Sequence, residues 1–155
     1  MSEWIDNVLA SAVKGEYPTT LARMKSGVVF IRDWQFLSGY CILVAYPRIN
    51  SLNDLNFEER ACFLNDMTLI GDAIKAVCNP IRINYEILGN KDNYLHAHIY
   101  PRYEWEEEAI RKDTIYRYSK EIWTDKKYYY TEEKHGILKK QLTENLIELM
   151  KQNYK

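Results

Sequence analysis

Two histidines stand two positions apart in the segment 94–103, which reads YLHAHIYPRY. Side chains two positions apart on a strand point to the same face, so His96 and His98 share a face with Tyr94 and Tyr100. One neutral imidazole can attack phosphorus, and its neighbour can donate hydrogen bonds to the phosphate oxygens that gather charge. Histidine suits both tasks because its pKa lies near neutrality. The spacing therefore favours chemistry at a phosphate group.

A metal site is the main alternative for the same pair. Sites on cupin-type β-barrels use two histidines at this spacing with a glutamate and a distant histidine, for which Glu104 and His135 are available. The chain lacks the roughly eight short strands that such a barrel needs, and His135 stands where a helix is expected to begin. A structural pair of histidines is the third interpretation, and the spacing alone does not separate the three.

The histidine segment needs neighbouring strands to hold it. Apolar runs predict strands at 28–31 and 41–46, joined through a turn at 37–39, and these two are expected to pair antiparallel. Alternating apolar and polar residues predict a strand over 81–87. A turn at 88–93 follows, and the histidines belong to a strand over 94–100 that Pro101 is expected to close.

Helices are expected between these strands and at both ends of the chain. Apolar spacing predicts a first helix over about 2–14 and a last helix over about 132–152. Asn56 as N-cap, with Glu59 three residues later, begins a long central helix whose apolar stripe ends before Pro80. A short helix is expected near 106–111. The order of elements predicts one α+β domain over 1–155 with a mostly antiparallel sheet.

The bulk composition excludes several classes of function. Hydrophobic residues make up 46% and charged residues 28% of the 155 residues, as in ordinary globular proteins. A formal net charge of -1 argues against binding to nucleic acid or to an anionic membrane. No apolar run approaches the ~20 residues of a membrane span, and the N-terminus does not read as a signal peptide. The three cysteines form no CxxC pair, so we expect free thiols and a cytoplasmic location.

Several segments together resemble the histidine triad family. "NYLHAHIYPRY" resembles its signature of three histidines at alternate positions, and "INYEILGN" resembles the strand before it. Upstream, "RDWQFLSGYCILVAYPRINSLNDLNFEE" resembles the first hairpin and the start of the following helix. The resemblance covers residues 28–103 and leaves 104–155 as a C-terminal helical extension. "LHAH" followed by "PRY.W" is most similar to bacterial members of the diadenosine polyphosphate hydrolase type. Several motifs in register are more specific than one histidine pair.

The resemblance implies a role for each histidine. His96 falls at the middle position, the nucleophile that becomes nucleotidylated, and His98 at the third position, which contacts the phosphate. Tyr94 replaces the first histidine. In the family, the other ring nitrogen of the nucleophile donates to the backbone carbonyl of that first position, which any residue supplies. Tyr94 bears instead on proton transfer to the leaving group and on the choice of substrate, and we count it among the substrate-binding residues.

Three further substrate-binding residues are implied with less support. The family binds ribose hydroxyls through an Asp or Asn of the first hairpin, which indicates Asp33, although a gapless count from Tyr40 indicates Arg32. Asn84 matches a strand amide that faces the nucleotide, and Asn90 lies where a loop can reach phosphate. A purely structural role is also compatible with Asp33 and Asn90, because both residue types favour turns. A base pocket is expected along 29–31, which core packing explains equally well.

The function implied is that of a nucleotide hydrolase or nucleotidyl transferase acting at the α-phosphate. Dinucleoside polyphosphates, nucleotide phosphoramidates and sugar nucleotides all fit. No metal ligands or cofactor are required, although Mg²⁺ on a polyphosphate substrate is compatible. The family also implies a homodimer. A catalytically inactive nucleotide-binding or regulatory protein on the same fold is the alternative, because the first histidine is absent.

Overall fold

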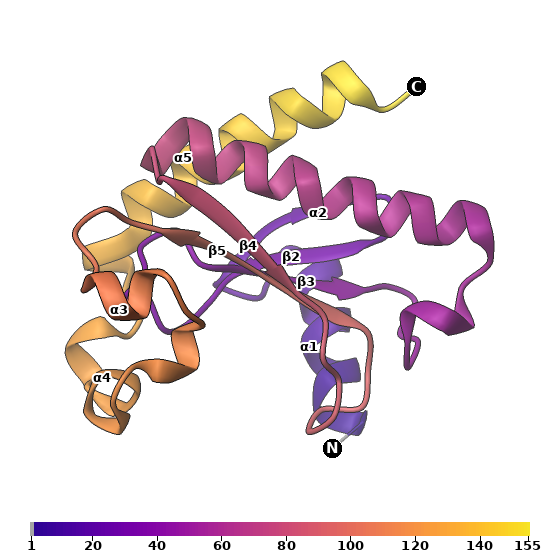
Figure 1. Ribbon diagram of the computed structural model, residues 1–155. Coiled ribbons are helices and arrows are strands. Elements are labelled where there is room, and N and C mark those ends of the chain that lie inside the picture. Colours follow the sequence, from indigo (N-terminus) through magenta and orange to yellow (C-terminus); the bar gives the residue numbers. More distant parts are fainter. Residues whose placement is uncertain (1) are drawn as a thin grey trace.

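Five strands form one antiparallel sheet in the order β1-β2-β3-β5-β4 in the computed structural model, which describes residues 2–155 (Figure 1). Their bounds are β1 (Thr20–Arg23), β2 (Gly27–Ile31), β3 (Cys41–Ala45), β4 (Arg82–Glu86) and β5 (His96–Arg102). The predicted pairing of the strands at 28–31 and 41–46 is confirmed, with Val29 opposite Leu43. The α+β class with a mostly antiparallel sheet is therefore confirmed.

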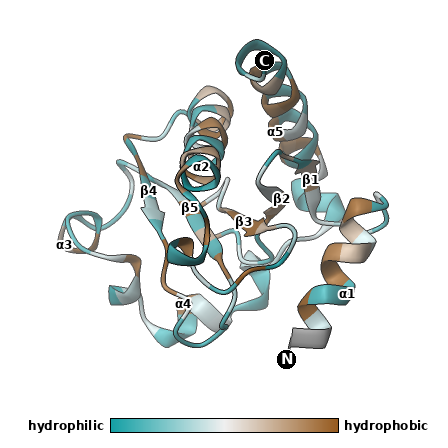
Figure 2. Ribbon diagram, turned by 90° about the vertical axis from the view of Figure 1, so that its right-hand side faces the viewer, coloured by the Kyte–Doolittle hydropathy of each residue, from teal (hydrophilic) through white to brown (hydrophobic). Residues whose placement is uncertain are grey.

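Helices cover both faces of this sheet (Figure 2). Two long helices lie on one face, and α1 with the short helices lies on the other. The helices are α1 (Ser2–Val13), α2 (Phe57–Cys78), α3 (Glu108–Arg111), α4 (Lys120–Thr124) and α5 (Glu132–Asn153), with short 3-10 turns η1 (Leu52–Asp54), η2 (Ile115–Arg117) and η3 (Lys126–Tyr128). None of the helices over residues 2–155 combines the length and apolar composition needed to cross a membrane.

The main core lies between the sheet and the pair α2 and α5. Asn56 caps α2 as predicted, since its side chain accepts from the backbone of Glu59 while the Glu59 carboxylate accepts from the backbone of Asn56. The helix then buries an apolar stripe on the strands, and α5 packs against both α2 and β1. This core includes Phe63, Ile70, Ile74, Leu43, Ala97, Ile99, Leu142 and Leu146. Burial of apolar surface is its main source of stability.

Two separate clusters cover the opposite side of the sheet, which we call the histidine face because it carries His96 and His98. The first cluster packs α1 on β2 and β3 through residues such as Ile5, Leu9 and Phe30. The second, the aromatic cluster, joins the turn after β2 to the segment after β5 and contains Trp34, Phe36, Tyr40, Tyr100, Tyr118, Trp123 and Tyr128. The two histidines lie between these clusters.

Arg102 attaches the segment after β5 to the sheet. Its buried guanidinium donates to both carboxylate oxygens of Glu106 at 3.1 Å and to the backbone oxygens of Ile110 and Asp113 at 2.7 Å. Glu106 also accepts from the Tyr118 hydroxyl at 2.6 Å. Apart from a bond from Arg102 to Asn84 on β4, the hydrogen bonds of this pair hold different parts of the segment 103–118, so the pair fixes that segment beside the histidine face.

The structure corrects two expectations about strands. Sequence reasoning missed β1, a four-residue edge strand without clear alternation of apolar and polar residues. The expectation that Pro101 closes the histidine strand was wrong, since β5 continues to Arg102. Pairing between β3 and β5 ends at Ile99, so no strand lies beside Pro101 on that side to need the missing N–H.

Candidate functional site

His96 is held in a single tautomer by the backbone. Its Nδ1 lies 2.8 Å from the carbonyl oxygen of Tyr94. A carbonyl oxygen can only accept, so Nδ1 carries the proton and Nε2 keeps its lone pair. Among the described residues Nε2 has no hydrogen-bond partner, and 8% of the residue remains exposed. This arrangement leaves a nucleophilic nitrogen available to a ligand.

His98 is held in the opposite tautomer by Tyr40. The Tyr40 hydroxyl lies 2.7 Å from Nδ1 of His98, and it has no other acceptor among the described residues. Burial raises the pKa of Tyr40, so its hydroxyl stays protonated and can donate. Nδ1 of His98 therefore accepts, and Nε2 carries the proton. The ring centroids of His96 and His98 are 5.2 Å apart, which places a lone pair and an N–H donor side by side.

The surroundings of His98 keep it neutral. Burial, the positive charge of Arg32 and the neighbouring His96 together lower its pKa from 6.5 to about 4, and burial contributes most. At neutral pH the imidazole is therefore an uncharged hydrogen-bond donor. Any positive charge at the site has to come from another residue.

Arg32 lies beside His98 and is positioned by aromatic rings. Its guanidinium carbon lies 4.6 Å from the ring centroid of Tyr40, 5.5 Å from that of Trp123 and 5.8 Å from that of Trp34. Trp34 and Trp123 stack on each other with centroids 4.1 Å apart. Arg32 directly follows the end of β2, two residues after Phe30, and this spacing brings both to the histidine face. Sequence reasoning considered Arg32 only as a rival to Asp33.

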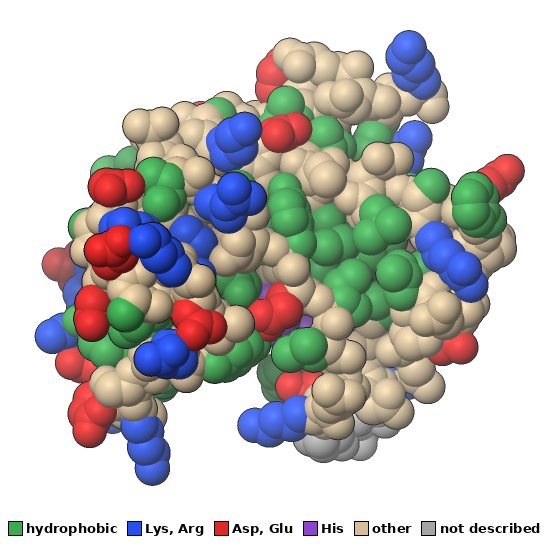
Figure 3. Space-filling model, viewed as in Figure 1, with side chains coloured by type: hydrophobic (Ala, Val, Ile, Leu, Met, Phe, Trp, Pro, Cys, Tyr) green, Lys and Arg blue, Asp and Glu red, His purple; other side chains and the backbone are tan. Residues whose placement is uncertain are grey.

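Glu86 faces His98 from the other side. The two residues are directly opposite each other on β4 and β5. The Glu86 carboxylate accepts from the hydroxyls of Tyr100 at 3.1 Å and Tyr116 at 2.5 Å. In Figure 3 a small histidine surface shows at the bottom of a recess, next to an acidic side chain. Sequence reasoning missed Glu86, although its register opposite the histidine pair was a usable signal.

A cavity of about 190 Å³ lies on the histidine face between α1 and the ends of β2 and β3. Its floor is apolar and includes Phe30, Ile42 and Val44, which is suitable for a nucleoside base. Arg32 and Asp33 line its polar end. Of the residues 29–31, where a base pocket was expected, Phe30 and Ile31 line this cavity and Val29 lies in the main core.

Tyr94 joins this cavity to a second one. Its ring lies 4.7 Å from that of His96, and burial and Asp92 raise its pKa, so the hydroxyl stays protonated. Together with Trp4 it lines both the 190 Å³ cavity and a neighbouring cavity of about 290 Å³, which also includes Arg48 and Lys91. Arg48 is paired with Asp6 at 2.7 Å.

Two of the predicted residues lie away from this group. The Asn84 amide oxygen accepts from Arg102 at 3.2 Å, and the residue lines a different cavity of about 470 Å³ near Arg111. Asn84 is opposite Tyr100, whereas Glu86 is opposite His98, so Asn84 lies two residues further along β4 than the residue that faces His98. Asn90 is exposed in the turn before β5 and lines none of these cavities. The residues brought together are thus His96, His98, Tyr94 and Asp33, joined by Arg32, Tyr40 and Glu86.

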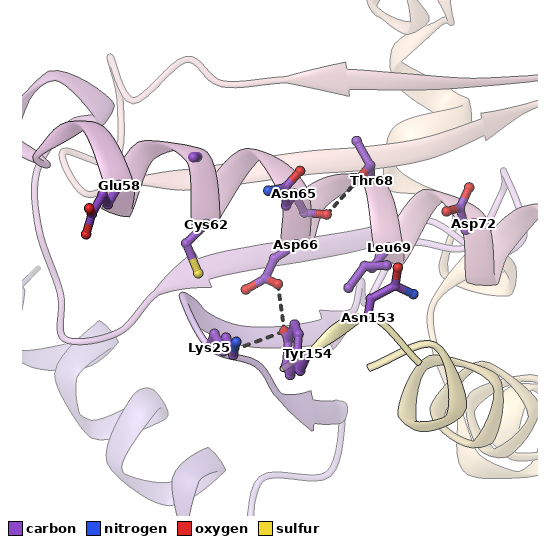
Figure 4. Close-up of a pocket in the computed structure, with 11 residues that line it drawn as sticks. Lys25, Glu58, Cys62, Asn65, Asp66, Thr68, Leu69, Asp72, Asn153 and Tyr154 are labelled. Carbon is purple, nitrogen blue, oxygen red and sulfur yellow. Dashed lines mark hydrogen bonds between the residues drawn. The ribbon is translucent and has the colours of Figure 1, made fainter. Parts of the chain in front are cut away.

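Another cavity, of about 530 Å³, lies away from the histidines between α2 and the C-terminal end of the chain (Figure 4). The buried Asp66 carboxylate accepts from the backbone and hydroxyl of Ser26 and, at 2.6 Å, from the Tyr154 hydroxyl. Both of its oxygens are therefore occupied by protein donors. This group ties the turn between β1 and β2 to the two long helices.

The barrel interpretation of the histidine pair does not fit the fold. The sheet is open, with β1 and β4 as its edges, and helices cover both faces. His135 lies in the first turn of α5, where its Nδ1 accepts from the backbone of Thr131 at 3.1 Å. Across the described residues, His, Cys, Asp and Glu side chains nowhere gather in a group of three that could hold a metal ion.

Comparison with solved structures shows the fold. The chain superposes on a histidine triad protein from Sinorhizobium meliloti 1021 with a TM-score of 0.66 at 19% identity, covering 81% of this chain and 87% of that one. A hypothetical histidine triad nucleotide-binding protein from Sulfolobus tokodaii gives a TM-score of 0.67 at 15% identity, covering 95% and 97%. At this identity the likeness concerns the fold alone.

A solved enzyme shares the same fold. The diadenosine triphosphate hydrolase of Plasmodium falciparum, solved in complex with Cyclomarin A, gives a TM-score of 0.55 at 13% identity, covering 88% of this chain and 79% of that one. No protein-family model matches the chain. No curated protein matches its sequence.

Proposed function

Because the chain has the histidine triad fold, we propose that it is a nucleotide-binding enzyme that cleaves a bond at the α-phosphate of its substrate. The observation that carries this proposal is the pair of opposite tautomers on β5. His96 presents a lone pair and His98 presents an N–H donor, with ring centroids 5.2 Å apart. A nucleophile and a phosphate-oxygen donor are what attack at phosphorus requires.

The proposed reaction has two steps. Nε2 of His96 attacks the α-phosphorus, a P–N bond forms, and the bond from phosphorus to the leaving group breaks with its electron pair on that group. Water then attacks the same phosphorus and loses a proton to solvent, the P–N bond breaks with its electron pair on Nε2, and nucleoside monophosphate and neutral His96 are released. The Nε2 proton of His98 stabilises the charge on the non-bridging oxygens in both steps.

The base and ribose of the substrate are assigned to the 190 Å³ cavity. Phe30, Ile42 and Val44 offer an apolar surface to a base, and Asp33 at the polar end can accept from ribose hydroxyls. Tyr94 lies between this cavity and the one that holds Arg48 and Lys91, where a leaving group can extend. The chain's own side chains supply these steps, and Mg²⁺ enters the proposal only as the counterion of a polyphosphate leaving group.

A turnover screen tests the proposal. Diadenosine polyphosphates, adenosine phosphoramidates and adenine sugar nucleotides are each incubated with the parent, with His96→Ala and with His135→Ala as a matched control far from the site. We expect His96→Ala to lose at least about 1000-fold in kcat/KM, which corresponds to about 4 kcal/mol, and His135→Ala to keep parent activity. Equal turnover by His96→Ala and the parent refutes the mechanism.

A catalytically inactive nucleotide-binding protein is the second candidate, favoured by Tyr94 at the position of the first histidine. Quenching of the parent with α-³²P-labelled substrate in alkaline denaturant, which preserves the acid-labile P–N bond, separates the two functions. An enzyme of the proposed type retains label on His96, detectable by mass spectrometry of the peptide, whereas a binding protein shows AMP affinity without labelled peptide or turnover.

We also propose that the protein forms a homodimer through β4 and α2. As an edge strand, β4 has a free row of backbone hydrogen-bonding groups. Figure 3 shows apolar side chains gathered on one face of the molecule. Exposed apolar residues of α2, of β4 and of the segments next to β4 are Phe57, Leu64, Ile81, Tyr85 and Leu88. Light scattering tests this proposal, with Tyr85→Glu expected to give monomers and Tyr129→Glu, on another surface, to remain dimeric. A monomeric parent refutes it.

A reducing compartment such as the cytoplasm is part of the same proposal. All three cysteines are free, and burial raises the pKa of Cys41, which keeps its thiol protonated. Free thiols persist in reducing compartments. Trapping thiols with an alkylating reagent at lysis should modify all of them after denaturation, and a disulfide between any two contradicts this location.

A further inference from the structure

Arg32 is a cation beside the two histidines that has no acidic partner. Among the described residues no carboxylate lies within ion-pair distance of its guanidinium, whereas Arg48 is paired with Asp6 and Arg102 with Glu106. Glu86, on the far side of His98, accepts instead from two tyrosine hydroxyls. The guanidinium also makes no side-chain hydrogen bond within residues 2–155, so its N–H donors are free for a ligand.

The position of Arg32 is nevertheless defined. Three rings, those of Tyr40, Trp34 and Trp123, lie within 4.6 to 5.8 Å of the guanidinium carbon. Cation–π contacts attract the charge without using the N–H groups, which lie in the guanidinium plane. Stacking therefore holds the cation in place and leaves its hydrogen-bonding capacity unused.

In the proposed function, Arg32 lies between the cavity assigned to the nucleoside and the histidines assigned to the phosphate. It lines the polar end of the 190 Å³ cavity beside Asp33. It also lies close enough to His98 for its charge to lower the pKa of that histidine. Since His98 is neutral and Tyr94 stands at the first histidine position, the described histidine face offers no other unpaired cation beside the two rings.

We propose that Arg32 binds the 5′-phosphate of the nucleotide and makes the site select ligands that carry this anionic group over the bare nucleoside. The proposal rests on the function proposed above and deepens it by naming the residue that recognises the phosphate. A guanidinium presents paired N–H donors that match two oxygens of one phosphate. Asp33 beside it accepts from the ribose hydroxyls, so one residue binds the ribose and its neighbour binds the phosphate.

Calorimetric titration with AMP and with adenosine tests this assignment. We expect Arg32→Gln to lose about 10- to 100-fold in AMP affinity while adenosine affinity stays within about twofold of the parent. Arg32→Lys keeps the charge without the planar donor pair and should fall between the two. Arg23→Gln removes an arginine that also lies over a tyrosine ring, 4.4 Å from the centroid of Tyr46, but lines neither cavity; it is the matched control and should bind AMP like the parent.

Three outcomes overturn the inference. AMP affinity within about threefold of the parent in Arg32→Gln does so, as does an equal loss of AMP and adenosine. The third uses adenosine 3′,5′-bisphosphate as ligand: if Arg32→Gln weakens this ligand and leaves AMP unchanged, Arg32 recognises a ribose phosphate instead. Should Arg32→Gln not fold, Arg32→Lys carries the same comparison, with AMP affinity reduced severalfold and adenosine unchanged.

Failure of this inference and failure of the proposed function are distinguishable. Binding of AMP requires no turnover, so a chain that binds AMP through Arg32 without labelling His96 refutes only the enzyme. If turnover depends on His96 but the Arg32→Gln variant binds AMP as tightly as the parent does, only the role of Arg32 is refuted. A histidine NMR titration adds a ligand-free measurement, because removal of the Arg32 charge should raise the pKa of His98.

Discussion

The two faces of the sheet are built in different ways, although the same five strands supply both. Under α2 and α5, strand β5 contributes Ala97 and Ile99 to a continuous apolar core. On the other face the same strand contributes His96 and His98, each held by one hydrogen bond. Apolar burial is non-directional and stabilises, whereas hydrogen bonds are directional and orient side chains. The comparison indicates that one face supports the fold and the other positions the site.

The largest effect is expected where the histidine face depends on a buried charge pair. Glu106→Ala leaves the Arg102 guanidinium buried without its carboxylate and frees the segment 103–118. We expect the free energy of unfolding to fall by about 3 kcal/mol or more, and AMP affinity to fall as well. Urea unfolding and calorimetry measure the two. Glu107→Ala, one residue along and exposed, is the control, and equal behaviour of both variants contradicts the role of the pair.

Acid should weaken the histidine face through His98. Its pKa is about 4 in the folded protein and about 6.5 when unfolded, so protons bind the unfolded chain first. The contribution of His98 to the free energy of unfolding is fully present above pH 6.5 and is lost as the pH falls toward 4. Between pH 7 and pH 4.5 this loss amounts to about 2 kcal/mol. Urea unfolding of the parent and of His98→Asn at both pH values measures it. The same loss in both proteins contradicts this account.

A substitution on the apolar face should separate stability from binding. Ile99→Val removes one methylene from the core and should lower the free energy of unfolding by about 1 kcal/mol. AMP affinity should stay within about twofold of the parent, because Ile99 points away from the histidine face. Thermal unfolding and calorimetry give both values. A loss of affinity larger than the loss of stability would show that the two faces are coupled.

The smallest effect is expected at the first triad position. Tyr94→His keeps the backbone carbonyl that accepts from Nδ1 of His96, so AMP affinity should change by less than about threefold while rate or substrate preference changes. Calorimetry and the turnover screen measure these two properties. Complete loss of AMP binding in this variant means that the side chain at position 94, and not its carbonyl, sets up the site.

Sequence reasoning predicted the elements whose periodicity is local. The apolar stripe and capping box of α2, the alternation of β4 and the two histidines on one face of β5 are all readable within a few residues. What it missed depends on distant contacts. The stack of Trp34 on Trp123 joins residues 89 positions apart by numbering, and nothing near either residue indicates it. The segment 103–130, expected to hold one short helix, contains several helical turns for the same reason.

The site was predictable in part. The spacing of His96 and His98 predicted their common face, and the carbonyl of Tyr94 was expected to fix the tautomer of His96. The partners of His98 were not predicted, because Tyr40 lies just before β3, far from His98 in the sequence, and Arg32 is held in part by Trp123 from the C-terminal third. The resemblance led us to count Asn84 among the substrate-binding residues, but in the structure its amide oxygen accepts a hydrogen bond from Arg102. Which partner a polar side chain binds depends on how elements that are distant in the sequence pack together.

The carbonyl that accepts from His96 belongs to the main chain, and this has a consequence for how such a sequence can change over generations. Every substitution at position 94 preserves that acceptor, so a lineage can exchange the first histidine for another residue in a single step without an intermediate that lacks the bond. On the proposed mechanism this position is free to drift, and new substrate preferences can arise there while the nucleophile stays in place.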